Sequence, residues 1–304
     1  MLRKLCLTTA LLWRLLVLIL RDILHQIVPA AKKDISNDVI LITGGGRGIG
    51  RRLALHFAKC HPKHIILWGR TQETLAETAR SVQDEGVNCA YMLCDVSARE
   101  QVYSLAKEVD AKFGHVTILI NNAGVVFANS FLNSDPEQIE TTLRTNTLAH
   151  FWTTKAFLPA MIEQKKGHVV AVGSVLGLIG LNGAADYCSS KFATDGFMDA
   201  LRDELRSEEL SDITVTTVYP YHVDNEMFAG ATTRFPKLFP SISEDYLAQK
   251  IVDAVLSGRE RMVVPKLFYL SALFYRIAPV PAIIAIMRFI GGHQVIENMK
   301  EHKS

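Results

Sequence analysis

A glycine-rich turn between an apolar strand and a helix restricts this chain more than any other feature. It reads Thr43-Gly44-Gly45-Gly46-Arg47-Gly48-Ile49-Gly50. It follows the apolar run Val39–Thr43, and a helical pattern begins near Ile49. Glycine permits positive φ angles and close approach of the backbone to a ligand, and the amides and dipole of a helix favour a negative charge. Strand, turn and helix in this order predict a pyrophosphate site; a tight turn of purely structural glycines is the alternative.

Short apolar strands alternate with helical patterns along most of the chain. The expected strands are Val39–Thr43, His64–Trp68, Cys89–Cys94, Val116–Ile120, His168–Gly173, Ile213–Tyr219 and Arg261–Val264. Long helices are expected over Thr71–Asp84, after Pro136 and over Tyr187–Arg206. This alternation predicts an α/β fold in which helices cover both faces of a parallel sheet. We expect one catalytic domain over residues 36–265, with appendages at residues 1–30 and 266–304.

The N-terminal appendage, residues 1–30, is strongly apolar but carries a polar stripe. On a helical wheel its polar residues fall within about a 100° arc; they are Arg3, Lys4, Arg14, Arg21, Asp22 and His25. A charge at mid-bilayer would cost about 2.5–3.5 kcal/mol, whereas a helix in the headgroup region avoids that cost. We predict a membrane anchor and favour an interfacial helix over a spanning one. A soluble core helix is the third possibility.

The C-terminal appendage contains a second apolar region, Met262–Gly292. Prolines and cations divide it into short pieces; they are Pro265, Pro279, Pro281, Lys266, Arg276 and Arg288. A single spanning helix is therefore not expected. We predict short apolar helices that contact a membrane or cover a substrate entrance, with ordinary packing against the main domain as the alternative.

Charge and cysteine content argue against several classes of protein. The formal net charge of +2 is too close to neutral to indicate nucleic-acid binding across a surface. The five cysteines form no Cys-x-x-Cys pair, so we expect neither a disulfide framework nor a metal site.

The residues after the second strand indicate which dinucleotide is bound. Many dinucleotide sites have an acid here that holds the ribose hydroxyls, but this chain has Gly69 and Arg70, and Arg47 stands in the glycine-rich turn. Two guanidinium groups can pair with a 2′-phosphate, which an acid would repel. The pattern favours NADP(H) over NAD(H), although either arginine alone would be compatible with a solvated surface position.

Two further strands end in polar residues at the sheet edge where open α/β folds bind ligands. Asp95 follows the third strand and can accept a hydrogen bond from an adenine amino group. Asn122 and Gly124 follow the fourth strand, and they either shape the adenosine pocket or brace the sheet.

A tyrosine and a lysine four residues apart form the candidate catalytic centre. Tyr187 and Lys191 share one face of a helix because of their spacing. A free tyrosine titrates near ~10, so we expect Lys191 and an oxidised nicotinamide to lower the Tyr187 pKa. Ser174 ends the preceding strand and can present its hydroxyl to a substrate oxygen, and Asn146 can hold a water that connects Lys191 to solvent. The alternatives are a buried helix aromatic and a solvated lysine.

Together these motifs resemble the short-chain dehydrogenase/reductase family over about Val39–Pro265. The resemblance implies a Rossmann-type, doubly wound sheet of seven strands. It also implies a catalytic tetrad of Asn146, Ser174, Tyr187 and Lys191, and a glycine motif and an Asn-Asn-Ala-Gly motif at Thr43, Gly44, Gly48, Gly50 and Asn121–Gly124.

Four stretches are similar to the membrane-associated retinol and 17-beta-hydroxysteroid dehydrogenases, and most of all to the retinal-reducing enzymes of that group. They are ITGGGRGIGR, LWGRT, FWTTKAFLP and RFPKLFP. One departure concerns the nicotinamide clamp, where the family has Pro-Gly and, shortly beyond, a threonine. This chain has Pro220-Tyr221, and Asn225 stands near the threonine position; an amide can both donate and accept a hydrogen bond.

The resemblance implies an NADPH-dependent oxidoreductase that reduces all-trans-retinal to retinol. A steroid or other lipid keto-reductase is the second possibility, a membrane or lipid-droplet interaction protein with vestigial catalysis is the third, and a nucleotide-binding regulator is the weakest. We expect a lipophilic substrate, a pocket lined by Val175–Ile179 and Met227–Phe239, and a cytosol-facing position on the endoplasmic reticulum or lipid droplets. We also expect no nucleic-acid partner, and consider a homo- or heterodimer possible.

Overall fold

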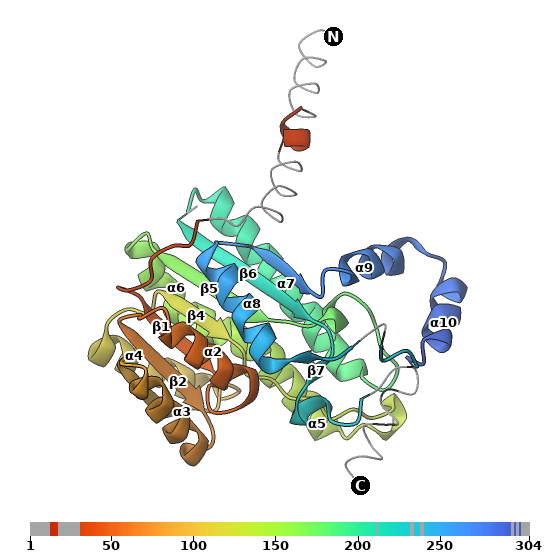
Figure 1. Cartoon of the computed structure of the whole chain (residues 1–304), viewed down its shortest axis with the longest axis horizontal. Helices are drawn as coiled ribbons and strands as arrows, with labels where there is room; N and C mark the ends of the chain where they lie inside the picture. The colour runs from red at the N-terminus through yellow and green to blue at the C-terminus, as the bar shows by residue number, and fades with distance from the viewer. Residues whose placement is uncertain are drawn as a thin grey trace. The chain divides into compact units, whose positions relative to one another are not determined.

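The computed structural model describes residues 13–17, 31–210, 212–231, 234–237, 240–292, 295 and 298. The chain separates into two units, residues 1–33 and 34–304, which are described individually (Figure 1). In the first unit, Trp13–Val17 is helical and exposed. The rest of the predicted anchor lies outside the described residues.

Seven parallel strands form the sheet of the second unit. They are β1 (Val39–Thr43), β2 (His64–Gly69), β3 (Cys89–Leu93), β4 (Ile118–Asn121), β5 (Gly167–Val172), β6 (Ile213–Pro220) and β9 (Arg261–Val264). Their order is β3-β2-β1-β4-β5-β6-β9, so the chain winds outward from β1 to one edge and then from β4 to the other. The predicted strands and the doubly wound parallel sheet are confirmed.

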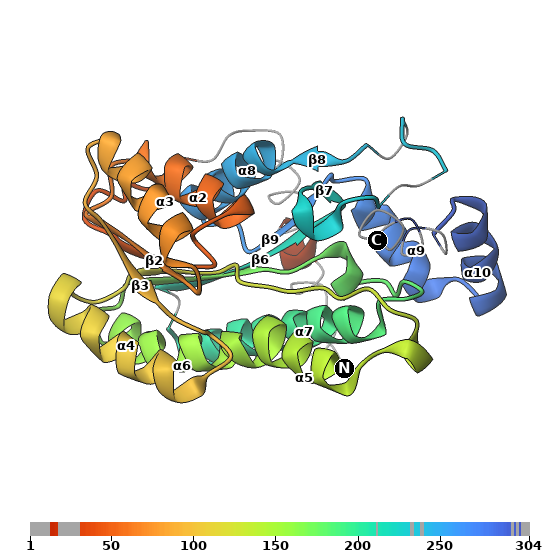
Figure 2. The same cartoon turned by 90° about the horizontal axis from the view of Figure 1, so that it is seen from below.

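Helices cover both faces of this sheet (Figure 2). One face carries α2 (Gly48–Ala58), α3 (Gln72–Asp84) and α8 (Glu244–Leu256), and the other carries α4 (Arg99–Phe113), α6 (Ala149–Glu163) and α7 (Ala185–Ser207). Alternate β1 side chains enter the two cores: Ile40 and Ile42 pack on the first face, and Val39 and Leu41 on the second. Burial on both faces explains why the strands are continuous apolar runs rather than alternating ones.

The helix expected after Pro136 is interrupted where a candidate catalytic residue lies. It consists of α5 (Pro136–Leu143), a π-helical turn η2 (Arg144–Leu148) and α6. Asp135 caps its start by accepting a hydrogen bond from the Glu137 amide. The extra residue in a π turn shifts the side chains around it, and Asn146 within η2 is completely buried.

The C-terminal region forms short elements beyond the sheet. The loop after β6 contains β7 (Val223–Asp224) and η4 (Glu226–Phe228), and β8 (Ile242–Ser243) pairs with β7. After β9 come two ten-residue helices, α9 (Phe268–Ile277) and α10 (Val280–Phe289). They confirm the prediction of short apolar helices. In the described part of the chain, no helix combines the length and apolar character needed to cross a membrane.

Candidate functional site

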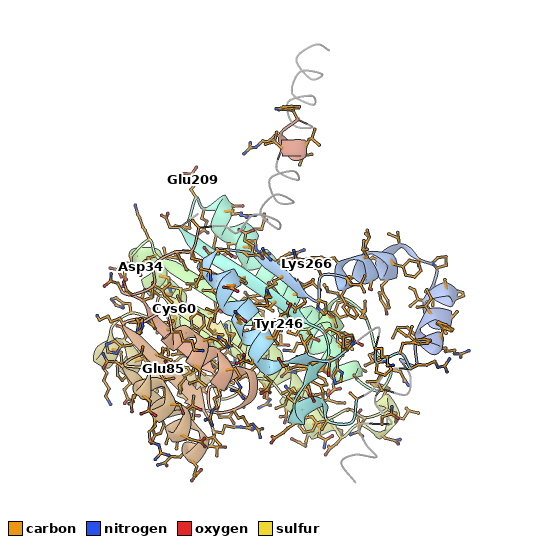
Figure 3. The ribbon with its side chains drawn as sticks, in the orientation of Figure 1. Asp34, Cys60, Glu85, Glu209, Tyr246 and Lys266 are labelled. Carbon is orange, nitrogen blue, oxygen red and sulfur yellow. The ribbon has the colours of Figure 1, made fainter. Side chains whose placement is uncertain are left out.

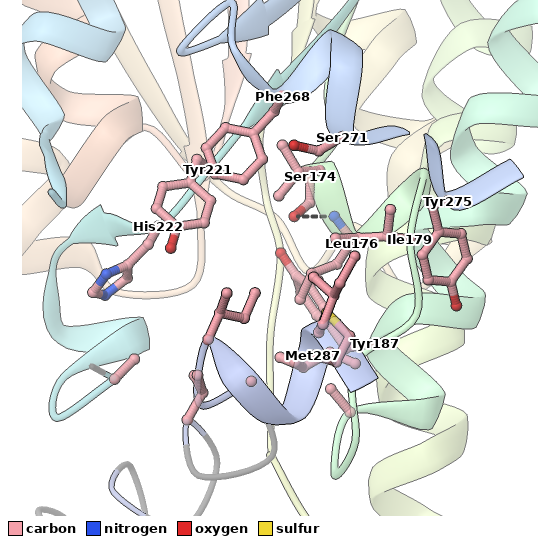
Figure 4. A pocket seen from close by; sticks show the side chains of 18 of the residues that line it. Ser174, Leu176, Ile179, Tyr187, Tyr221, His222, Phe268, Ser271, Tyr275 and Met287 are labelled. Carbon is pink, nitrogen blue, oxygen red and sulfur yellow. Dashed lines mark hydrogen bonds between the residues drawn. The ribbon is translucent and has the colours of Figure 1, made fainter. Parts of the chain in front are cut away.

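Tyr187 and Ser174 meet at the carboxyl edge of the sheet. Tyr187 lies in the first turn of α7, and Ser174 follows β5. The Ser174 side chain hydrogen-bonds Tyr187, and its oxygen also accepts from the Leu176 amide at 3.1 Å (Figure 4). That second bond makes Ser174 the cap of the short 3-10 helix η3 (Val175–Gly177) and fixes its orientation. Both side chains line an apolar cavity.

Burial has the largest effect on the pKa of the Tyr187 hydroxyl. The sequence led us to expect a lowered pKa, but burial raises the pKa of Tyr187, and only the Ser174 hydrogen bond clearly opposes that shift. In these surroundings the hydroxyl is protonated at neutral pH, and a proton is available on it.

Lys191 is held beneath Tyr187. Its Nζ donates to the Val172 carbonyl at 2.9 Å and lies 5.7 Å from the centroid of the Tyr187 ring. Burial lowers the pKa of Lys191 to about 8. A Cβ on Gly124 would lie 3.9 Å from Lys191 Nζ and 3.3 Å from Asn146 Oδ1, which places these three predicted residues side by side.

Asn146 braces this centre from η2. Its side chain accepts from the Val125 amide at 2.8 Å and donates to the Val125 carbonyl at 2.9 Å. Its Nδ2 also donates to Ser190 Oγ at 3.1 Å, and that hydroxyl donates to the Tyr187 carbonyl at 2.7 Å. Asn146 therefore ties the segment after β4 to the start of α7. Its expected role in holding a water stays a prediction.

The glycine-rich turn has the shape that a pyrophosphate requires. Gly44 and Gly48 have positive φ angles of 67° and 57°, and a Cβ on Gly50 would lie 2.1 Å from the Gly44 carbonyl. The cap residue of α2, Arg47, makes no side-chain cap hydrogen bond, so a ligand anion can accept from the first-turn amides. Ile49 secures the turn by packing against the core. These residues fit a dinucleotide.

Thr43 and Asn122 support the turn from below. Asn122 Nδ2 donates to the Thr43 carbonyl at 2.9 Å. Thr43 Oγ1 in turn accepts from the amides of Asn122 at 3.0 Å and Ala123 at 3.1 Å. Of the two roles considered for Asn122, the structure shows the brace.

Three other predicted cofactor residues lie at neighbouring strand ends. Arg70 follows β2 and is exposed. Arg47 is also exposed and lies 3.5 Å from the carboxylate of Glu226. Asp95 follows β3, and its carboxylate accepts from the Ser97 amide at 3.0 Å and hydroxyl at 2.7 Å. In the structure Asp95 orders its own loop, while the two arginines project toward solvent.

The residues of the expected nicotinamide clamp follow β6. Pro220 ends that strand, and Asn225 caps η4 by accepting from the Phe228 amide at 3.3 Å. The Asn225 side chain also hydrogen-bonds the carboxylate of Glu244. Sequence reasoning missed Glu244, because an acid after Ser243 looks like an ordinary helix N-terminus.

An apolar cavity of about 430 Å³ extends from Ser174 and Tyr187. The predicted Val175, Leu176, Ile179 and Phe228 line it, whereas Leu178 packs in a neighbouring cluster and Met227 is not in the lining. Phe235 instead packs against Phe289, and residues 238 and 239 lie outside the described residues.

The other wall of the cavity comes from α9 and α10, in the segment that was expected to contact a membrane or cover a substrate entrance. Phe268 stacks on Tyr221, with ring centroids 4.1 Å apart. Tyr275 from α9 fits against Gly180, where a Cβ would lie 3.1 Å from the tyrosine hydroxyl. Ile283, Ile286 and Met287 of α10 complete this wall (Figure 4).

Comparisons with known proteins agree with this geometry. A family model described as short chain dehydrogenase matches residues 38–234. The chain is 40% identical over 287 residues to Short-chain dehydrogenase/reductase 3 of Homo sapiens, covering 94% of each chain. It is 36% identical over 286 residues to Epidermal retinol dehydrogenase 2 of Homo sapiens, covering 94% of this chain and 92% of the relative.

Solved structures share the fold. A metagenomic short-chain oxidoreductase in complex with NADP aligns at 25% identity and a TM-score of 0.64, covering 76% of this chain and 96% of that one. A short-chain dehydrogenase/reductase from Burkholderia phymatum in complex with NAD aligns at 22% identity and a TM-score of 0.71, covering 80% and 94%. Sequence, fold and site geometry together place the chain in the short-chain dehydrogenase/reductase family, as a dehydrogenase or reductase enzyme.

Proposed function

We propose that this enzyme uses NADPH to reduce all-trans-retinal to retinol. The observation that carries the proposal is the buried Tyr187–Ser174 pair in the lining of an apolar cavity. A cavity of about 430 Å³ lies in the range of about 300–1,000 Å³ for small-molecule sites. The printed name of one relative, Epidermal retinol dehydrogenase 2, supports the substrate class.

The catalytic roles follow from the geometry. When bound, the dinucleotide supplies the hydride that adds to the carbonyl carbon. Tyr187 Oη gives its proton to the alkoxide as it forms, and Ser174 Oγ donates a hydrogen bond to the same oxygen. Lys191 stabilises the tyrosinate that results, and Asn146 supports proton supply. Burial raises the Tyr187 pKa, so the hydroxyl is protonated before the hydride is transferred and can serve as the proton donor once the alkoxide forms.

The remaining cofactor roles are also proposals. We infer that the amides around Gly44, Gly48, Ile49 and Gly50 bind the pyrophosphate, supported by Thr43. Asp95, Asn122 and Gly124 would shape the adenosine side of the site, and Tyr187 and Lys191 would contact the nicotinamide ribose. Pro220 and Asn225 would hold the nicotinamide.

Replacing Arg70 with Asp should reverse the preference for NADPH over NADH. The substitution removes a cation available to the 2′-phosphate and adds an anion that repels it. We expect kcat/KM with NADPH to fall by at least about tenfold, equivalent to 1.4 kcal/mol, while kcat/KM with NADH holds or rises. Arg80→Asp, which makes the same charge change on an exposed position of α3, is the control. Equal losses with both cofactors would refute the role of Arg70.

The substrate assignment is tested by competition between lipid carbonyls. Membranes containing the full chain are incubated with NADPH and either all-trans-retinal or a 17-ketosteroid, and products are measured by chromatography. We expect retinol to form with the higher kcat/KM. Faster steroid reduction would replace retinal with the second substrate class, and NADPH binding without either product would point to a non-enzymatic role.

We further propose that α9 and α10 contact a membrane. Their exposed apolar side chains include Leu267, Leu270, Leu273, Ile277, Val280, Ile284, Ile286 and Phe289. Residues 261–292 contain no acid, and their four cations include Lys266, labelled in Figure 3. Lipid tails accept such side chains and anionic headgroups accept the cations. With the predicted anchor at residues 1–30, this surface would attach the domain at residues 36–265 to the cytosolic face of the endoplasmic reticulum or a lipid droplet.

A double substitution, Ile277→Glu with Phe289→Glu, tests that contact. A charge in the bilayer interior costs about 2.5–3.5 kcal/mol, so we expect at least about a tenfold lower kcat/KM for retinal dissolved in vesicles. The rate with a short, water-soluble aldehyde should not change. The control is Phe131→Glu with Leu132→Glu, because those residues are also largely exposed but lie in η1 (Phe131–Asn133), which is not part of the cavity lining. A loss with both aldehydes, or with the control variant, would contradict the membrane contact.

A further inference from the structure

The first residue of α8 lies against the first residue of α2. These two helices pack side by side on one face of the sheet (Figures 1 and 2). A Cβ built on Gly48 would lie 3.0 Å from Glu244 Oε1 and, among the residues that the structure describes, would meet only this carboxyl group within 4 Å. The carboxyl group of Glu244 is therefore at the positive end of α2, where a pyrophosphate is expected to bind.

Glu244 also orients the candidate nicotinamide clamp. The Asn225 side chain hydrogen-bonds the carboxylate of Glu244, while Asn225 Oδ1 accepts from the Phe228 amide. With its oxygen committed to that cap, the Asn225 amide group is held in one orientation. One acid thus contacts both ends of the expected dinucleotide site, the glycine-rich turn and the clamp.

Neighbouring charges have opposite effects on the Glu244 carboxylate. Arg52 of α2 attracts the carboxylate, whereas Glu226 of η4 and Asp224 of β7 repel it. Arg47 approaches Glu226. On α8 itself, Asp245 pairs with His56 of α2 at 3.0 Å. Partial burial is the largest influence and raises the pKa of Glu244 above its ordinary value.

We propose that Glu244 is a positioning residue that couples binding of the dinucleotide to uptake of one proton. A pyrophosphate at the first turn of α2 brings negative charge against the Glu244 carboxylate. Protonation removes that repulsion and leaves an acid that still hydrogen-bonds Asn225. Binding therefore favours the protonated form, and affinity falls as rising pH ionises the free enzyme. This inference rests on the proposed dinucleotide site and not on retinal as substrate.

The test is an NADPH titration of the full chain in detergent from pH 5.5 to 8.5, followed by nicotinamide fluorescence. Wild type is compared with Glu244→Gln, which keeps a hydrogen-bonding amide but cannot ionise. We expect the ratio of the wild-type Kd to the variant Kd to rise with pH. The total rise across the titration should be about tenfold for each unit by which binding raises the pKa of Glu244. The 2′-phosphate titrates identically in both proteins, so it cancels from the ratio. Asp245→Asn, which removes the neighbouring charge, should leave wild-type pH dependence.

Calorimetry on the wild type tests the proposal even if the variants fail to fold. The enthalpy of NADPH binding is measured in buffers that differ in ionisation enthalpy, and its dependence on the buffer gives the number of protons taken up or released on binding. The same measurement with NADH tests a ligand that has no 2′-phosphate. Net proton uptake is expected with NADH, and NADPH should take up the same proton once the proton exchange of its 2′-phosphate is subtracted. A Kd ratio that is constant with pH, or binding of NADH without proton uptake, would overturn the role of Glu244 while leaving the proposed function intact. Failure of NADPH and NADH to bind at any pH would overturn both.

Discussion

A Tyr187→Phe enzyme should lose about 10²- to 10⁴-fold in kcat for retinal reduction, the range typical of a missing general acid. The substitution removes one oxygen from a buried side chain and leaves the ring in place. Because Lys191 is held by the Val172 carbonyl rather than by the tyrosine hydroxyl, its position should persist. The Kd for NADPH should therefore stay within a few-fold of wild type. Stopped-flow measurement of NADPH oxidation separates these two quantities.

Tyr275→Phe is the matched control for that result. Tyr275 lines the same cavity from α9, so the variant removes a hydroxyl from the same pocket without touching the Tyr187–Ser174 pair. We expect near wild-type kcat. Similar losses in both variants would indicate that the hydroxyls support the shape of the pocket, and Tyr187 would no longer qualify as the acid.

The second large effect is expected from Gly50→Ala. Its Cβ would lie 2.1 Å from the Gly44 carbonyl and 2.8 Å from Asn122 Nδ2. Neither the Gly44 carbonyl nor the Asn122 amide can move without breaking the hydrogen bonds that hold the turn. The added methyl group therefore forces α2 away from the turn. We expect the free energy of unfolding to fall by about 3 kcal/mol or more, at the upper end of overpacking costs. NADPH binding should be lost with it.

Gly196→Ala is the control for the effect of a methyl group on a glycine. Gly196 is an exposed residue within α7, and a Cβ there meets nothing within 4 Å. Alanine should stabilise the helix by about 0.5–1 kcal/mol relative to glycine. Chemical denaturation of both variants measures the difference. A stable Gly50→Ala protein that binds NADPH normally would contradict the close packing of the turn.

Local pattern was sufficient to predict the sheet. The central strands are buried on both faces, so their apolar runs stand out between polar helix surfaces, as in Val39–Thr43. The interruption of the helix after Pro136 was not predictable in the same way. Within η2, Asn146 accepts a hydrogen bond from the Val125 amide and donates one to Ser190 Oγ, and both partners are distant in sequence.

In the candidate site, too, contacts within one element could be predicted from the sequence, whereas contacts between elements could not. Tyr187 and Lys191 are four residues apart, so helix geometry alone placed them on one face. Asn225 and Glu244 follow β7 and β8, and their contact arises because these two short strands, far apart in sequence, pair with Asp224 beside Ser243. The direction of the Tyr187 pKa was also beyond sequence reasoning, because it depends on how completely the fold removes the hydroxyl from water.

The cavity wall shows how tertiary packing decides the function of an apolar segment. In sequence, the region around Phe268 was compatible with membrane contact, an entrance cover or simple core packing. In the fold, Phe268 stacks on Tyr221 inside the cavity, while Ile277 and Phe289 face outward. The same two helices therefore serve the pocket with one face and present apolar side chains on the other.

The most direct test of the central claim follows the hydride itself. Vesicles containing the full chain and all-trans-retinal are supplied with NADPH deuterated at one or the other face of nicotinamide C4, and the retinol is analysed by mass spectrometry. We predict a single deuterium on the carbinol carbon from one of the two labelled cofactors, and none when Tyr187 is replaced by Phe within the same reaction time. Retinal that remains unreduced while NADPH binds, or retinol that carries no deuterium from either cofactor, would contradict the proposed activity.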